Sequence, residues 1–327
     1  MSTSEDRGHL LRTGRADPLV LDRSVYKRLG KVFRKDRGSA PGLGTCSLPG
    51  PRTGYWAVIE AANEAACRFR PGSVTTSLFL PEGSGEEKLR ELEDGIREAA
   101  LQTGLFVAGG RTEVTAAVNT PVVTAAVSGK PDAEAYDTEV PHACMELVAC
   151  GYAGLSGSVF LAEYAEEELS GCFPSFLLEN VREMSGLAAA GEALAAAAGT
   201  GAFLQHVSTG GIFAGLWHLS EETGFGFTAD LPSVPIRQET IEIAEHFGIN
   251  PYELWSEGMF LAAAAEGKGE ELCARLRELG FPASRIGQLE AGKGRRITNR
   301  GETRDLGRPG ADPLQQCLRC ELKYREQ

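Results

Sequence analysis

Residues 205–217 read QHVSTGGIFAGLW. Two hydroxyl residues, Ser208 and Thr209, come before Gly210 and Gly211, and an apolar run with the pattern of a helix start follows. Glycine lets the backbone approach an anion closely, and the N-terminal end of a helix carries a partial positive charge. We therefore expect a glycine turn between a strand and a helix, with a shape suited to hold a phosphate.

Two further glycine turns are expected at the ends of strands. They are Gly109-Gly110-Arg111-Thr112-Glu113 and the sequence GYAGLSG at residues 151–157. Each can expose backbone N–H groups to an anion. A short motif of this kind is more often an ordinary turn than a phosphate site, so both interpretations stay open for all three segments, the turn at 208–211 included.

Helical and strand patterns alternate along the rest of the chain. Helices are predicted at 20–35, 55–69, 86–104, 158–169, 174–198, 237–248 and 270–280, and strands at 74–80, 105–109, 121–129, 145–155, 259–264 and 285–291. Repeated Gly and Pro predict a loop at 38–54. This alternation is typical of an α/β (α+β) fold.

The chain is long enough for two domains. It has 327 residues, and single domains cluster around roughly 100–150 residues. The hydrophilic segment 130–143 is the best candidate for the joint between them. We therefore predict a tail at 1–19, an N-terminal domain at 20–135, a C-terminal domain at 144–306 and a second tail at 307–327, with Leu254 and Trp217 in the core.

Composition and charge exclude several classes of protein. The hydrophobic fraction of 42% and the charged fraction of 24% are typical of a soluble globular protein. No apolar stretch reaches the ~20 residues that span a bilayer, and the polar start of the chain lacks the apolar core of a secretory signal, so we expect no membrane and a cytoplasmic location. The net charge of −12 opposes nucleic-acid binding by the whole surface.

The charge is unevenly distributed. Residues 1–37 hold ten Lys and Arg against five Asp and Glu, residues 285–327 hold ten against six, and the region between them is strongly acidic. The basic ends can fold back on the acidic body or bind an anionic partner, and the former is the more ordinary arrangement.

Eight cysteines do not reach the density of a disulfide-stabilised scaffold, so most are expected to be buried thiols. Cys317 and Cys320 form a CxxC pair near the C-terminus. With no second CxxC or paired histidines, this pair is a weak indication of a metal or redox site.

A series of motifs in fixed order resembles a known family. The motifs are SVYKRL, ANEAA, LFLPEG, GGRTEVTAAVNTPVVT, GYAGLSGS, HVSTGGIFAGLW, PIRQETIEIAEHFGINPYEL and SEGMFLAA, and they run from about residue 20 to about residue 306. Together they resemble the aminoimidazole-ribonucleotide (AIR) synthetase-related superfamily, and within it the branch of hydrogenase expression/formation protein E and its bacterial relatives. The long motif at 235–254 is the most specific.

The resemblance implies a fold and an activity. The implied fold has an N-terminal α/β domain, whose strands pair with those of a second subunit to form a barrel, and a C-terminal α/β domain. The implied activity uses ATP and magnesium near the dimer interface and transfers the γ-phosphate to an amide or carboxyl oxygen. Such chemistry is mostly charge neutralisation, so acidic metal ligands are needed.

The sequence departs from this family where acids are expected. Segment 38–54, where the family has an acid in a glycine loop, contains no Asp or Glu. An Asn-Asp pair appears as Asn63-Glu64, the family's Gly-Gly-(Asp/His/Glu)-Thr motif carries Arg111, and the acid that opens the Asp-x-Thr-x-Gly-Gly motif is His206. Arg111 can hold phosphate or pair with Glu113, and His206 can be structural or transfer protons.

Two hypotheses follow. In the first, the protein is a homologue with a degraded Mg-ATP site that binds or regulates a protein partner or an active paralogue as a homodimer. In the second, it is an active ATP-dependent enzyme with Glu64 and Glu113 as metal ligands. By resemblance, the nucleotide-binding candidates are Asn63, Glu64, Gly109, Gly110, Arg111, Thr112, Ser208, Thr209, Gly210 and Gly211.

Overall fold

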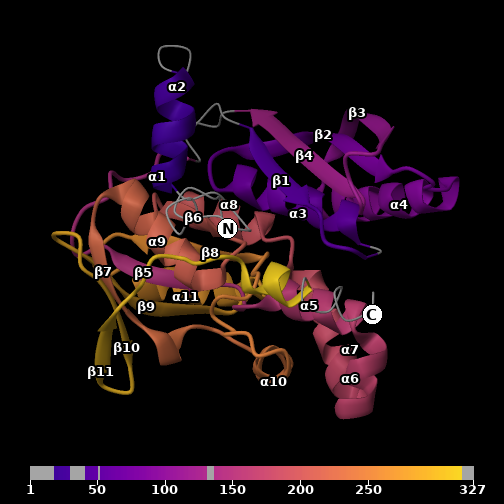
Figure 1. Ribbon diagram of the computed structural model, residues 1–327. Coiled ribbons are helices and arrows are strands. Elements are labelled where there is room, and N and C mark those ends of the chain that lie inside the picture. Colours follow the sequence, from indigo (N-terminus) through magenta and orange to yellow (C-terminus); the bar gives the residue numbers. More distant parts are fainter. Residues whose placement is uncertain (1–17, 30–40, 51, 131–135, 319–327) are drawn as a thin grey trace, which may run out of the picture.

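The chain forms two β-sheets, one from each half of the sequence (Figure 1). The computed structural model describes residues 18–29, 41–50, 52–130 and 136–318. The first sheet has four strands and the second has seven. The α/β (α+β) class predicted from the sequence is confirmed, whereas the domain limits 20–135 and 144–306 stay predictions.

The N-terminal sheet has the strand order β1-β4-β2-β3. Its strands are β1 (Gly42–Cys46), β2 (Arg70–Pro81), β3 (Phe106–Thr115) and β4 (Val122–Lys130), and the helices α3 (Thr53–Ala66) and α4 (Glu86–Thr103) pack on one face. Strands β2 and β3 are parallel and α4 connects them, while the other pairs are antiparallel. A short helical segment precedes the sheet, with α1 (Pro18–Leu21) and α2 (Lys27–Leu29) joined by a π-helical turn at Asp22–Tyr26.

The predicted loop at 38–54 is wrong in part, because its residues 42–46 form the edge strand β1. Gly42 and Gly44 face α3, and a Cβ atom on either would collide with the helix backbone at Ala61 or Ala57. The glycines thus permit close packing between strand and helix. On the open side of β1, the N–H groups of Leu43 and Thr45 donate to carboxylates of α3 rather than to another strand.

The predicted glycine turn at 109–113 is also wrong, because all five residues lie inside β3. They pair in register with Thr75 to Phe79 of β2, and an added Cβ on Gly110 would collide with Thr76. The parallel neighbour therefore overrides the tendency of glycine to form a turn. Strand β3 is the other edge of the sheet, and Phe106, Val107 and Val114 are exposed on it.

The C-terminal sheet has the order β11-β10-β7-β9-β5-β8-β6. Its strands are β5 (Glu146–Cys150), β6 (Phe203–Val207), β7 (Gly226–Asp230), β8 (Met259–Ala264), β9 (Ala283–Glu290), β10 (Arg295–Asn299) and β11 (Glu302–Asp305). Strand β8 is buried on both faces, since its alternate residues join two different apolar clusters. One cluster contains α9 (Gly211–Thr223), and the other contains α8 (Gly191–Ala198) and α11 (Gly269–Glu278).

A shared core joins the two halves of the chain. The helices α5 (Leu155–Tyr164), α6 (Glu166–Cys172), α7 (Ser175–Glu183) and α10 (Gln238–His246) contribute to it together with α3 and α4. Trp56 of α3 packs edge-on against Trp255, with ring centroids 5.0 Å apart. Leu254 is fully buried as predicted. The core position predicted for Trp217 is wrong in part, because this residue is only partly buried and the guanidinium of Arg295 lies 3.8 Å from the centre of its ring.

Most predicted helices and strands are confirmed, with ends shifted by a few residues. The helix predicted at 158–169 instead spans parts of α5 and α6, and the region 174–198 contains α7 and α8 with a 3-10 turn at Met184–Leu187 between them. Residues 30–35 of the helix predicted at 20–35 lie outside the described residues. Helix α4 ends at the predicted Gly104, which adopts the left-handed conformation with φ 70°. Four of the seven described cysteines are buried, Cys317 is partly buried, and Cys320 lies outside the described residues. None of the helices in the described ranges has the length and apolar character needed to cross a membrane.

Candidate functional site

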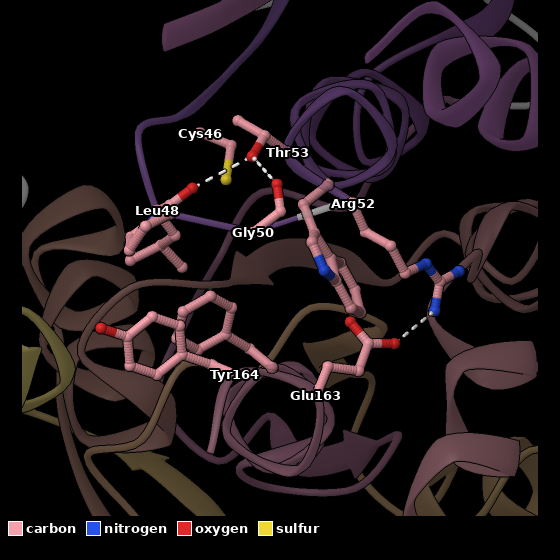
Figure 2. Close-up of a pocket in the computed structure, with 10 residues that line it drawn as sticks. Cys46, Leu48, Gly50, Arg52, Thr53, Glu163 and Tyr164 are labelled. Atoms are coloured by element: carbon pink, nitrogen blue, oxygen red, sulfur yellow. Dashed lines mark hydrogen bonds and ion pairs between the residues drawn. The ribbon is translucent and has the colours of Figure 1, made fainter. Parts of the chain in front are cut away.

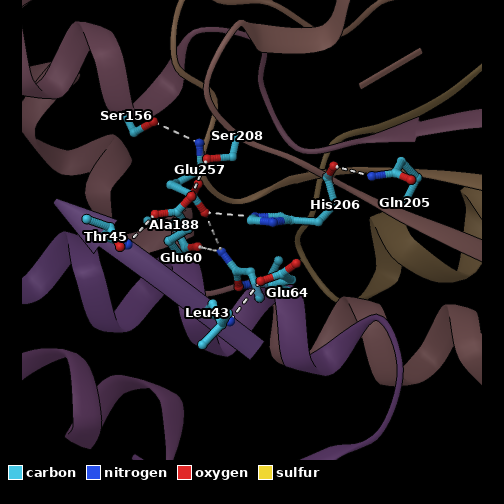
Figure 3. Close-up of polar contacts among 12 residues, drawn as sticks. Leu43, Thr45, Glu60, Glu64, Ser156, Ala188, Gln205, His206, Ser208 and Glu257 are labelled. Atoms are coloured by element: carbon cyan, nitrogen blue, oxygen red, sulfur yellow. Dashed lines mark hydrogen bonds and ion pairs between the residues drawn. The ribbon is translucent and has the colours of Figure 1, made fainter. Parts of the chain in front are cut away.

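The polar residues of interest meet between the two sheets, where α3 faces the end of β6 and the segment that leads into β8 (Figure 3). We call Asn63, Ser156, His206, Ser208 and Glu257 the interdomain cluster. All five residues are buried. Buried polar groups are costly unless they are paired, so the partners of each one define what the cluster can do.

An ion pair lies at the centre of the interdomain cluster. The Nε2 atom of His206 lies 2.9 Å from Oε2 of Glu257, and the two side chains are 5% and 0% exposed. The backbone N–H of Glu257 donates to Oγ of Ser156 at 2.7 Å. The second carboxylate oxygen, Oε1, has no hydrogen-bond partner among the described residues.

The two residues shift each other's protonation. Burial alone would lower the pKa of His206, but the charge of Glu257 and the hydrogen bond to it, followed by the charges of Glu64 and Glu60, raise this pKa above its ordinary value. Burial would likewise raise the pKa of Glu257, but His206 lowers it below the ordinary range. Both shifts favour an imidazolium paired with a carboxylate.

Asn63 links α3 to the C-terminal half of the chain. Its Nδ2 donates to the carbonyl of Ala188 at 2.8 Å and to Oε2 of Glu257 at 3.3 Å, and its Oδ1 accepts from the N–H of Ala190 at 3.0 Å. The amide of Asn63 therefore has structural partners on both its nitrogen and its oxygen.

Two glutamates of α3 lie beside this cluster, and each is already engaged. Glu64 accepts the N–H of Leu43 at 2.8 Å and forms an ion pair with Arg68 at 2.9 Å. Glu60 accepts the N–H of Thr45 at 2.9 Å and the hydroxyl of Ser208 at 3.1 Å. Both acids thus fasten β1 to α3, and Glu60 also reaches the end of β6.

The turn at 208–211 has the predicted position between β6 and α9. Gly210 and Gly211 have φ values of 81° and 61°, which favour glycine. An added Cβ on Gly211 would come within 2.8 Å of the carbonyl oxygen of Leu254, so the segment before β8 packs directly against this turn. Backbone conformation and close packing thus explain why glycine occupies both positions. Phosphate binding by the turn stays a prediction, with Ser208, Thr209, Gly210 and Gly211 as its candidate residues.

The residues of the β3 motif are not brought to the interdomain cluster within one chain. Arg111 and Glu113 pair with each other at 2.8 Å, and their side chains are 76% and 43% exposed. They lie on the opposite edge of the N-terminal sheet from β1, with β4 and β2 between the two edges. Gly109, Gly110 and Thr112 lie on the same exposed strand. A nucleotide-binding role for this strand stays a prediction.

The interdomain cluster does not fit a magnesium ion. Magnesium needs several oxygen ligands in octahedral geometry, usually including one or two carboxylates. Here Glu257 is paired with His206, and Glu64 is paired with Arg68. In the described part of the chain, no three His, Cys, Asp or Glu side chains are grouped so that they could hold a metal.

The sequence motifs do not identify Glu60 or Glu257 as candidate site residues. Glu257 comes two residues before the buried strand β8, in the motif SEGMFLAA, where a fully buried acid is unexpected. This position beside an apolar run is a usable signal, because a buried carboxylate needs a partner of opposite charge or several donors. Glu60 has no such signal, since it sits in an alanine-rich helix.

Comparisons with known proteins extend this picture. Residues 145–299 match the family described as AIR synthase related protein, C-terminal domain. The chain is 24% identical over 250 residues to carbamoyl dehydratase HypE of Rhizobium leguminosarum bv. viciae, a match that covers 75% of this chain and 70% of that protein.

Solved structures show the same similarity. The hydrogenase maturation protein HypE of E. coli aligns with a TM-score of 0.67 and 20% identity, covering 90% of this chain and 97% of that one. A HypE structure in complex with ATP gives a TM-score of 0.66 and 18% identity, with coverage of 92% and 97%. Residues 145–299 thus carry an AIR synthase-related C-terminal domain. Over about 90% of its length, the chain also has the fold of HypE.

Proposed function

We propose that this protein is a pseudoenzyme of the AIR-synthase-related superfamily, a binding or regulatory homologue with weak or no turnover of ATP. The observation that carries the proposal is the buried pair of His206 and Glu257, 2.9 Å apart. A carboxylate neutralised by an internal histidine is a poor ligand for a second cation, because the two positive charges would compete for the same oxygen.

The chemistry of phosphoryl transfer supports this proposal. Transfer of a γ-phosphate depends on positioning and on neutralising the phosphate charge, for which magnesium ions are the main agents. Glu64, the acid of the Asn63-Glu64 pair in α3, forms an ion pair with Arg68 and accepts a backbone N–H of β1. Releasing it to a metal would cost these contacts.

The test is isothermal titration of ATP into the purified protein with and without magnesium, combined with a phosphate-release assay. We expect no magnesium-dependent increase in affinity and no phosphate release above background. Magnesium-dependent hydrolysis that is abolished by Glu64→Ala would overturn the proposal. Glu86→Ala, at an 81% exposed side chain in the first turn of α4, is the matched control for the loss of one glutamate.

The alternative is an active ATP-dependent enzyme that phosphorylates an amide or carboxyl oxygen. It is favoured by the similarity to a HypE structure that holds ATP. In this case Glu64, or Glu113 from the exposed strand β3 of a second subunit, would supply the missing ligands. A phosphorylated or dehydrated product, formed only with magnesium, would identify this activity.

We also propose that the protein is a homodimer that pairs through the face and edge of the N-terminal sheet around β3. Phe106, Val107 and Val114 are 65%, 47% and 59% exposed on this edge strand, and such apolar edges favour pairing with another strand. In sedimentation experiments, Val107→Lys is expected to convert the dimer into a monomer. Leu101→Lys, on the 71% exposed residue at the end of α4, is the control and should leave the mass unchanged.

A further inference from the structure

Carboxylates approach His206 from two parts of the molecule. Glu257, from the segment before β8, forms the direct contact of 2.9 Å. Glu60, from α3, reaches the same place, because its Oε1 accepts the hydroxyl of Ser208, two residues after His206, at 3.1 Å. The charges of Glu64 and Glu60 both raise the pKa of His206. The buried histidine therefore faces acids from both halves of the chain, while Arg68 pairs with Glu64 at the edge of this group.

We propose that the imidazolium of His206 is a built-in counter-ion, which holds these acids together and takes the place that a bound divalent cation would otherwise fill. This inference deepens the proposed function, because it assigns a physical cause to the loss of the metal. The protein then needs no metal ion to bring its two halves together.

The surroundings of Glu257 support a role as a cation site. Asn63 and Ser156 fix the position of this residue through hydrogen bonds to its carboxylate and its backbone N–H. Its Oε1 atom accepts no hydrogen bond from the described residues, although the side chain is fully buried. A buried carboxylate in which one oxygen lacks a donor depends on nearby positive charge. His206 supplies this charge through its contact with the other oxygen, Oε2.

The same geometry predicts what happens when this cation is removed. In a His206→Asp variant, a fourth carboxylate would enter a group whose members then repel one another. A divalent cation binds several carboxylate oxygens at once and would relieve the repulsion, whereas sodium at the same ionic strength only screens it weakly inside a buried site.

The experiment measures the melting temperature of the wild type and of His206→Asp in EDTA, in millimolar MgCl₂ or MnCl₂, and in NaCl of matched ionic strength. The wild type is expected to melt at the same temperature in all three buffers. The variant is expected to melt lower in EDTA and to recover by about 5 °C or more when the divalent cation exceeds its Kd roughly a hundredfold.

The matched control is His246→Asp. His246 also pairs with a glutamate, Glu168, at 2.7 Å, but this pair lies at the surface. The control is expected to melt close to the wild type and to show no response to divalent cations. A wild type stabilised by magnesium, or a His206→Asp variant indifferent to divalent cations, would overturn the inference.

A second measurement covers the case in which His206→Asp does not fold. Ring-nitrogen chemical shifts of labelled histidine report the protonation of His206 in the wild type and in Glu257→Gln. We expect the wild-type ring to stay protonated above its ordinary range and the variant ring to lose its proton at lower pH. A neutral ring in the wild type at pH 6 would contradict the inference. ATP turnover by the wild type would instead overturn only the proposed function.

Discussion

Two histidine–glutamate pairs that join residues far apart in the sequence have similar geometry but different surroundings. His206 and Glu257 lie 2.9 Å apart in the interdomain cluster, with side chains 5% and 0% exposed. His246 of α10 and Glu168 of α6 lie 2.7 Å apart at the surface, with side chains 24% and 53% exposed. The shorter contact belongs to the surface pair, so the N–O distance alone does not show which pair contributes more to stability.

The difference in burial, rather than in distance, decides how much each pair contributes to stability. Water and salt screen the surface pair, and such pairs contribute ~0–1 kcal/mol to stability. In the buried pair each charge has given up its hydration, so each depends on the other, and loss of one partner leaves an uncompensated charge in the interior. The comparison therefore predicts very different responses to the same mutation.

The largest effect is expected for Glu257→Ala. Removing this carboxylate leaves the charge of buried His206 without its partner and also frees Asn63 Nδ2 from one acceptor. We expect the free energy of unfolding to fall by about 3–5 kcal/mol, measured by urea denaturation. A loss below about 1 kcal/mol, as for a surface pair, would show that the buried pair is not ionised.

A smaller effect is expected from pH. The pKa of His206 is raised from its ordinary 6.5, so its contribution is complete below pH 6.5 and is lost as pH rises through the folded-state pKa. The pKa of Glu257 is lowered from 4.5, so its contribution is present above pH 4.5 and is lost as pH falls through its folded-state pKa. The pair therefore stabilises the fold most between these two ordinary values.

This pH dependence can be isolated with a double variant, His206→Gln with Glu257→Gln, in which neither side chain titrates. Urea denaturation at pH 6 and pH 9 is expected to show that the wild type loses more stability than the double variant on the alkaline side. Equal losses in the two proteins would mean that other groups cause the change.

The smallest effect is expected for Glu168→Ala. This substitution breaks the surface pair with His246, and the histidine can then be solvated. The free energy of unfolding should change by about 0–1 kcal/mol in the same urea assay. A loss comparable to that of Glu257→Ala would mean that burial does not separate the two pairs.

The sequence predicts the fold well where local pattern and final environment agree. Amphipathic spacing and a C-terminal glycine identify α4, and the apolar run at 259–264 identifies β8 without error at either end. Prediction fails at 109–113, where the glycines suggest a turn but pairing with β2 imposes a strand. It fails in the same way at Gly42 and Gly44, whose packing against α3 is a tertiary effect.

The sequence predicts only part of the candidate site. The replacement of an expected acid by His206 can be read from the motif, and so can the position of the turn at 208–211. The partner of His206 cannot, because Glu257 lies 51 residues further along the chain and only the antiparallel pairing of β6 with β8 brings the two together. Nor does the sequence reveal that Arg68 and the edge of β1 engage Glu64.

The two edges of the N-terminal sheet have a consequence for how large an assembly can grow. Glu64 and Glu60 occupy outward N–H groups of β1, so a strand from another molecule would have to displace two carboxylates before it could pair there. At the other end of the same sheet, β3 offers an exposed edge. A sheet that can be extended at one end only cannot polymerise into a fibre, because the first union of two copies consumes the extendable end of each.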